Sequence, residues 1–193
     1  MGKFSVIPQN AFDELQTEAG VLLSDFDPSS GAIDDEDIIC ATKGGIKAVC
    51  RPTYRDNGQD VDNCPPNMKE LKEILYYECR LDFTALSMTP ETFKLSIGAA
   101  SASTITAGKG SKISPKHELT DADFKDIWWV GDKSDGGMVA VCLKNALSAD
   151  GFSIQTDKDS KGQLSVSMLG HYSITAQKTV PMEFYVADAT AST

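Results

Sequence analysis

Two histidines, His117 and His171, are the side chains of this sequence best suited to acid–base or metal chemistry near neutral pH. His117 stands in a charged segment, and His171 falls on the polar face of a predicted strand, where a hydrogen-bonded or exposed imidazole is ordinary. No G-x-S-x-G or H-E-x-x-H arrangement places a nucleophile or a second ligand beside either one. The sequence therefore predicts no catalytic site, and we expect a protein that is not an enzyme.

Two polar segments resemble ligand-binding loops but lack the necessary residues. A phosphate loop built on the Gly-Lys pair of GKGS, at 108–111, needs a Gly five residues before that pair and a Ser or Thr directly after it. The sequence has Ser103 and Gly110 at these two positions. DKDSKG at 157–162 has Lys161 where a calcium loop needs an oxygen ligand. The first predicts no phosphate site, the second is interpreted as a polar turn, and no cofactor or metal is expected.

The chain is acidic, with 28 acidic and 18 basic residues among 193 and a formal charge of −10. Such a charge argues against ordinary nucleic-acid binding, because affinity for phosphates depends on cationic side chains. It is compatible with a conduit through which DNA slides, since a repulsive wall prevents sticking.

The five cysteines are odd in number and widely spaced, without a CxxC or Cys/His pairing that would indicate zinc. They are interpreted as free thiols that fill a core in a reducing compartment. The cysteines are Cys40, Cys50, Cys64, Cys79 and Cys142.

The first residues lack the apolar region of a signal peptide, and no apolar run reaches membrane-spanning length. We therefore expect synthesis in a cytoplasm and no membrane partner.

Two predicted strands lie on either side of a long connection. The first contains residues 46–51; the second covers about 74–86, with odd positions from Leu75 to Ala85 facing the core and even positions forming a mixed-charge face. If they pair as a hairpin, Lys47 and Arg51 could meet Glu78 and Asp82 across the ladder, but the register cannot be read from the sequence. The connection, residues 54–68, is far longer than the roughly two to five residues of ordinary hairpin loops. It is either disordered or reserved for a partner, and the anchoring strands favour a partner.

One helix is predicted over residues 89–98. Thr89 can cap it, Pro90 suits its first position, and Gly98 can end it. Phe93 and Ile97 then share a face. The helix is short and must pack on a sheet to persist.

Further strands are predicted at 127–130, 138–143 and 164–174, and around Phe152 and Met182 to Val186. Segment 138–143 is apolar on both faces, as in a central strand. Adjacent Trp128 and Trp129 must point to opposite sides, so one lies on an outer face. There it is exposed unless another element or an interface covers it, which is a modest hint of self-association. Near the N-terminus a short helix is possible over 11–18, and acidic residues 34–37 indicate a solvated connection.

The prediction is one mostly β (α+β) domain over 1–193: two packed β-sheets, as a sandwich or half-open barrel, flanked by one α-helix.

Four stretches carry a family resemblance: GVLLSDFDP at 20–28, residues 53–71, residues 118–137, and residues 151–186, ending in GHYSI and VPMEFYV. With the predicted helix, they resemble the major tail proteins of firmicute-type siphophages, the phage tail tube proteins. The resemblance implies the phage tail tube fold, and subunits that form hexameric rings and stack into a hollow tube that delivers phage DNA to the host.

The resemblance also implies interface residues. It makes residues 54–68 an inter-ring loop, residues 1–37 an N-terminal arm, and residues 188–193 a short C-terminal tail. The implied loop contacts are Tyr54, Arg55, Asp56, Asn57, Asp60 and Asp62. The implied arm interface is Leu22, Leu23 and Phe26, and the candidate lumen face is Glu78, Arg80 and Asp82.

The implied partners are other copies of the chain, a tape-measure protein, tail tip and tail terminator proteins, and DNA that passes without specific binding. The implied location is the virion tail, after assembly in the bacterial host cytoplasm. Two alternatives stay open: a secretion-system tube subunit of the same fold, and a monomeric β-sandwich virion or binding module.

Overall fold

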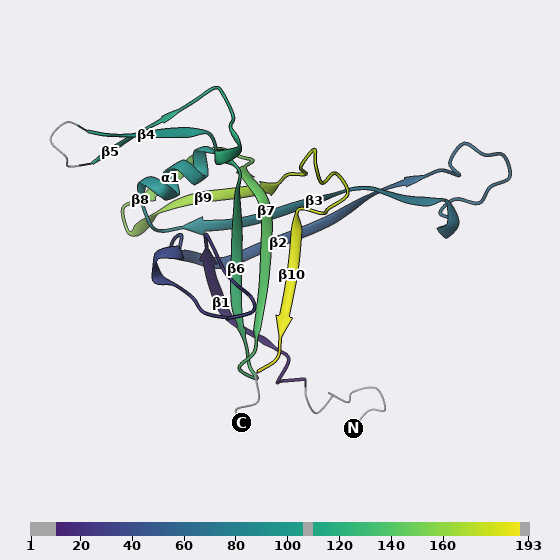
Figure 1. The fold of residues 1–193 in the computed structure, drawn as a ribbon, viewed down its shortest axis with the longest axis horizontal. Helices are drawn as coiled ribbons and strands as arrows, with labels where there is room; N and C mark the ends of the chain where they lie inside the picture. The colour runs from purple at the N-terminus through teal and green to yellow at the C-terminus, as the bar shows by residue number, and fades with distance from the viewer. Residues whose placement is uncertain (1–10, 106–109, 190–193) are drawn as a thin grey trace.

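The computed structural model describes residues 11–105 and 110–189, and in these ranges the chain is mostly β. It contains an eight-stranded antiparallel sheet, a two-stranded sheet and one α-helix (Figure 1). The large sheet consists of β1 (Gln16–Leu23), β2 (Thr42–Asp56), β3 (Lys72–Ala85), β6 (Lys125–Lys133), β7 (Met138–Ser148), β8 (Ser153–Asp157), β9 (Ser160–Gly170) and β10 (Met182–Ala187). The small sheet pairs β4 (Ala100–Thr104) with β5 (Ser111–Pro115), and the helix is α1 (Pro90–Ile97).

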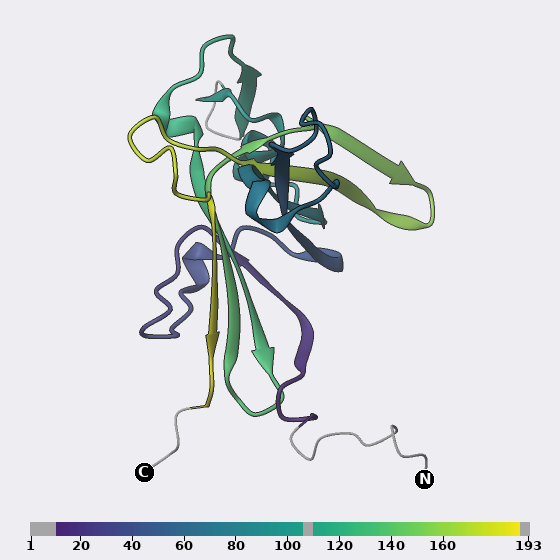
Figure 2. The same cartoon turned by 90° about the vertical axis from the view of Figure 1, so that its right-hand side faces the viewer.

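The large sheet has two halves that cross one another (Figures 1 and 2). One half contains β1, β6, β7 and β10, and the other contains β8, β9, β3 and β2. They are joined where the end of β7 pairs with the end of β9, with Ala146 opposite Gly170. Because the sheet turns over at this junction, its two halves enclose a core between them.

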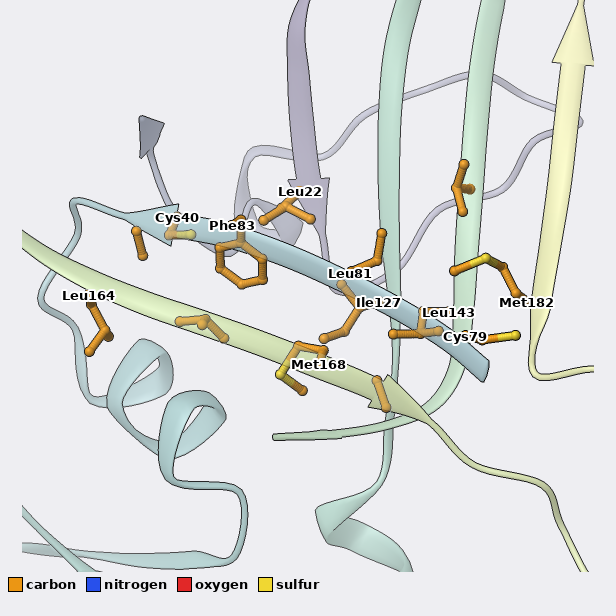
Figure 3. Packing of buried hydrophobic residues seen from close by; sticks show 14 residues of the cluster. Leu22, Cys40, Cys79, Leu81, Phe83, Ile127, Leu143, Leu164, Met168 and Met182 are labelled. Atoms are coloured by element: carbon orange, nitrogen blue, oxygen red, sulfur yellow. The ribbon is translucent and has the colours of Figure 1, made fainter. Parts of the chain in front are cut away.

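This core is built from the apolar face of each half (Figure 3). The alternation predicted for β3 and β9 is confirmed where the two strands pair. Leu81 and Phe83 are buried there, and so are their partners Met168 and Val166. The alternation in 164–174 ends with β9 at Gly170, and Ile174 is exposed. The buried residues of this cluster are Leu22, Cys40, Cys79, Leu81, Phe83, Ala85, Ile127, Val141, Leu143, Ala146, Leu164, Val166, Met168 and Met182.

A smaller cluster covers the opposite face of β6 and β7. It contains Trp128, whose ring meets Phe26 edge-on at 5.7 Å between centroids. Strand β7 is thus buried on both faces, as its continuous apolar sequence predicted.

Trp129 is partly buried, because another segment of the same chain covers part of it. Its indole Nε1 donates a hydrogen bond of 3.0 Å to the carbonyl of Ala19, at the edge of the core. Gly20 makes this contact possible: its φ is +70°, and a Cβ there would lie 2.5 Å from Nε1.

The short helix predicted over 11–18 is wrong, because residues 11–14 form turns and β1 begins at Gln16.

The predicted helix is confirmed. Thr89 Oγ1 accepts a hydrogen bond from the amide of Thr92, Pro90 takes the first position, and Gly98, with φ of +90°, ends the helix. The most buried side chains are Thr92 and Ser96, whereas Phe93 contacts Phe152 instead. Residues 108 and 109 of the segment GKGS lie outside the described residues.

Candidate interface: the projecting hairpin

Strands β2 and β3 form a hairpin that extends well beyond the rest of the molecule (Figure 1). Its register brings Lys47 opposite Asp82 and Arg51 opposite Glu78, which confirms the predicted pairing. The ladder continues to Asp56 and its partner Lys72. Residues before Tyr77 on β3 are exposed, whereas every second residue from Cys79 is buried. The sheet core therefore supports only the inner part of the hairpin.

Apolar side chains on the projecting part remain uncovered in the monomer. The sequence assigned Leu75 to the core face, but it is exposed because the strand has left the core there. A register shift puts Thr53 opposite Tyr76 and Tyr54 opposite Ile74, which leaves Leu75 as an extra residue without a partner. The uncovered side chains are 40–57% exposed: Tyr54, Val61, Met68, Ile74, Leu75 and Tyr76.

Asp56 orders the loop at the end of the hairpin. Its carboxylate accepts a hydrogen bond of 3.0 Å from the amide of Asn67 and one of 3.1 Å from the amide of Gly58. These bonds hold the pKa of Asp56 below its ordinary value of 3.8. Gly58 lies so close to Cys64 and Leu71 that a Cβ would be 2.8 Å from each side chain. The loop is therefore a packed turn, with one short 3₁₀ segment, Lys69–Leu71.

The predicted inter-ring residues divide between this loop and the strand below it. Tyr54, Arg55 and Asp56 belong to β2, so the connection starts at residue 57 and not at 54. The other three, Asn57, Asp60 and Asp62, are exposed in the loop. Sequence reasoning missed Ile74, Leu75 and Tyr76; the signal was the length of the strand, which exceeds what one core can cover.

The three residues nominated on the N-terminal arm need a correction. Leu22 and Leu23 are fully buried, and Phe26 is 5% exposed. Within residues 1–37, Gln16–Leu23 is a strand of the large sheet, with Leu22 opposite Trp129 and Leu23 opposite Trp128. These side chains already contact the chain's own core, so they do not offer an interface.

The candidate lumen residues lie together on the polar face of β3. Arg80 Nε donates to Asp82 Oδ1 at 3.1 Å and to Ser167 Oγ at 2.9 Å, and Ser167 donates to Asp82 at 2.6 Å. Arg80 Nη2 also pairs with Asp150 at 3.1 Å. Glu78 lies on the same face opposite Arg51. This face is mixed in charge rather than acidic, and Arg80 is held by two carboxylates.

The described residues offer little for chemistry. Within 11–105 and 110–189, no group of three or more His, Cys, Asp or Glu side chains is arranged to hold a metal ion. His171 Nδ1 lies 3.1 Å from the carbonyl oxygen of Asn145, and its ring meets Phe124 edge-on. Among these residues, none of the helices has the length and apolar character needed to cross a membrane.

Neither a protein-family model nor a curated protein matches the chain.

Proposed function

We propose that this chain is a structural subunit that assembles with copies of itself into hexameric rings, which stack as the hollow tail tube of a siphophage. The observation that carries the proposal is the projecting β2–β3 hairpin, with its ordered tip and uncovered apolar side chains. A monomeric domain gains nothing from holding such side chains away from its core, whereas a subunit buries them against a neighbour.

A second exposed surface supports the same proposal. In the described residues, β10 pairs only with β7, so its other edge is open. On this strand Phe184 and Val186 are 60% and 70% exposed. Open edges and apolar side chains invite pairing with another chain. Head-to-tail contacts between subunits need two different surfaces, and the hairpin and β10 supply them.

The finer fold assignment belongs to this proposal. The two halves of the large sheet, packed face to face, would be the two sheets of a sandwich or half-barrel with the phage tail tube fold. The face with Glu78, Arg80 and Asp82 would line the lumen. Its cations are partly neutralised by neighbouring carboxylates, which suits a wall along which DNA passes without specific binding.

The proposed partners are copies of the chain, a tape-measure protein, and tail tip and terminator proteins. Assembly would take place in the host cytoplasm and end in the virion tail.

Negative-stain electron microscopy of the purified protein across a concentration series tests the proposal. Hollow tubes or six-fold rings are the expected result. A monomer at all concentrations would favour the alternative of a β-sandwich binding module.

A loop deletion separates folding from assembly. Removing residues 57–62, and closing the hairpin with a short turn, should leave a folded protein by circular dichroism that no longer forms tubes. Normal tubes from this variant would remove the loop from the stacking contact.

A further inference from the structure

Two cysteine thiols meet at the root of the projecting hairpin. Cys50 on β2 and Cys79 on β3 are direct partners in the ladder, and their sulfur atoms lie 3.8 Å apart. Cys79 is fully buried in the core (Figure 3), whereas Cys50 is partly exposed. One thiol is therefore shielded and the other accessible to a small molecule.

The backbone geometry of this pair suits a disulfide. Directly opposite residues of antiparallel strands have Cα atoms about 4.5 or 5.5 Å apart, and both values lie within the roughly 4.4–6.8 Å range of disulfides. The ladder is regular on both sides, with Val49 opposite Arg80 and Arg51 opposite Glu78. The sulfur atoms need to approach by about 1.8 Å to reach bonding distance, which side-chain rotation can supply.

The other cysteines lack such a neighbour in the part of the chain that the structure describes. Cys64 Sγ contacts the Pro65 carbonyl and the Met68 sulfur, and Cys40 and Cys142 are buried singly. The five cysteines, whose odd number argued against a disulfide framework, thus comprise one adjacent pair and three single thiols.

We propose that Cys50 and Cys79 form a redox-sensitive pair, which a small-molecule disulfide such as glutathione disulfide oxidises to a cross-strand disulfide. The Cys50 thiolate attacks one sulfur of the small disulfide; that S–S bond breaks, and one thiolate leaves. Cys79 then attacks the Cys50 sulfur and displaces the second thiolate. The protein loses two thiol protons and two electrons, and the small disulfide becomes two thiols.

The order of attack follows from burial. Burial, and to a lesser degree the adjacent Cys50, raises the pKa of the Cys79 thiol to about 12. Cys79 is therefore protonated at neutral pH, and the accessible Cys50 reacts first. The resulting covalent ring, residues 50–79, would enclose the whole projecting hairpin and hold β2 to β3 at its root. This inference is independent of the proposed tube.

Peptide mapping tests the pair directly. The full-length folded protein is incubated with glutathione disulfide at mildly alkaline pH, its remaining thiols are alkylated, and it is digested with trypsin. Each cysteine falls in a different peptide: 4–43, 48–55, 56–69, 73–80 and 134–144. We expect peptides 48–55 and 73–80 to be recovered linked, about 2 Da lighter than their sum, and to separate on treatment with dithiothreitol.

Three variants control the result. Cys50→Ser and Cys79→Ala should each abolish the linked peptide, whereas Cys64→Ser should leave it unchanged. If both peptides are recovered alkylated to the same extent with and without oxidant, the pair is not redox-sensitive and the proposal fails. A link that forms only in denaturant, or one that joins Cys64 equally often, would also overturn it.

Discussion

Replacing Ile74 and Leu75 together by serine should weaken self-association without unfolding the chain. The two side chains are 48% and 43% exposed. Full burial of such a side chain contributes about 1.5–3 kcal/mol, so covering the exposed half of each at a subunit contact contributes about 1 kcal/mol. The pair then contributes about 2 kcal/mol per contact, or about 30-fold in the association constant.

The assay is sedimentation across a concentration series, with circular dichroism as the check on folding. With one hairpin contact per subunit, the concentration at which assemblies form should rise by about 30-fold. A matched control is available: Ile33 is 47% exposed but lies in the connection between β1 and β2. The single variant Ile74→Ser should raise the threshold about 5-fold, and Ile33→Ser should leave it unchanged. Equal thresholds for these two single variants would refute the assignment of the hairpin as an interface.

Three further predictions concern folding. Gly20→Ala should lower the free energy of unfolding, measured in urea, by at least about 1 kcal/mol more than Gly31→Ala. Both glycines have positive φ, but only at Gly20 would a Cβ displace the indole and its hydrogen bond, and equal losses would contradict this packing. Thr89→Ala should cost about 1 kcal/mol in the same assay by removing the helix cap, and no measurable loss would argue against that cap. The hydrogen bonds by which the Asp56 carboxylate orders the loop should persist above its ordinary pKa of 3.8. They should be lost as the pH falls through the lower pKa that Asp56 has in the folded protein, so the Asn67 amide resonance should titrate with a midpoint below pH 3.8. A midpoint at or above 3.8 would contradict the described bonds.

The parts of the fold that depend on local chemistry could be predicted from sequence. The cap at Thr89, the end of the helix at Gly98, and the alternation along β3 each depend on neighbours in the chain. That Lys47 and Arg51 could meet Glu78 and Asp82 was also predictable, because the two strands follow one another and their charges are complementary, but the register came only from the structure.

Features that depend on distant contacts could not be predicted. The run Gly20 to Leu23 has the same apolar pattern whether it is a free arm or a core strand, and only its pairing with β6 decides. The cover over Trp129 likewise comes from Ala19, and one carboxylate that holds Arg80 comes from Asp150. At the hairpin, the sequence predicted the long connection but not where the core ends, because alternation continues after burial stops.

The pairing of β1 with β6 has a consequence for how the chain folds as it is synthesised. Leu22 and Leu23 emerge early, yet their partners Trp129 and Trp128 follow only about a hundred residues later. Contacts so distant in sequence form slowly, because a long loop must close first. The apolar end of β1 therefore stays uncovered during most of translation, while the β2–β3 hairpin can already form. We expect nascent chains that stop before β6 to depend on chaperones and to aggregate without them.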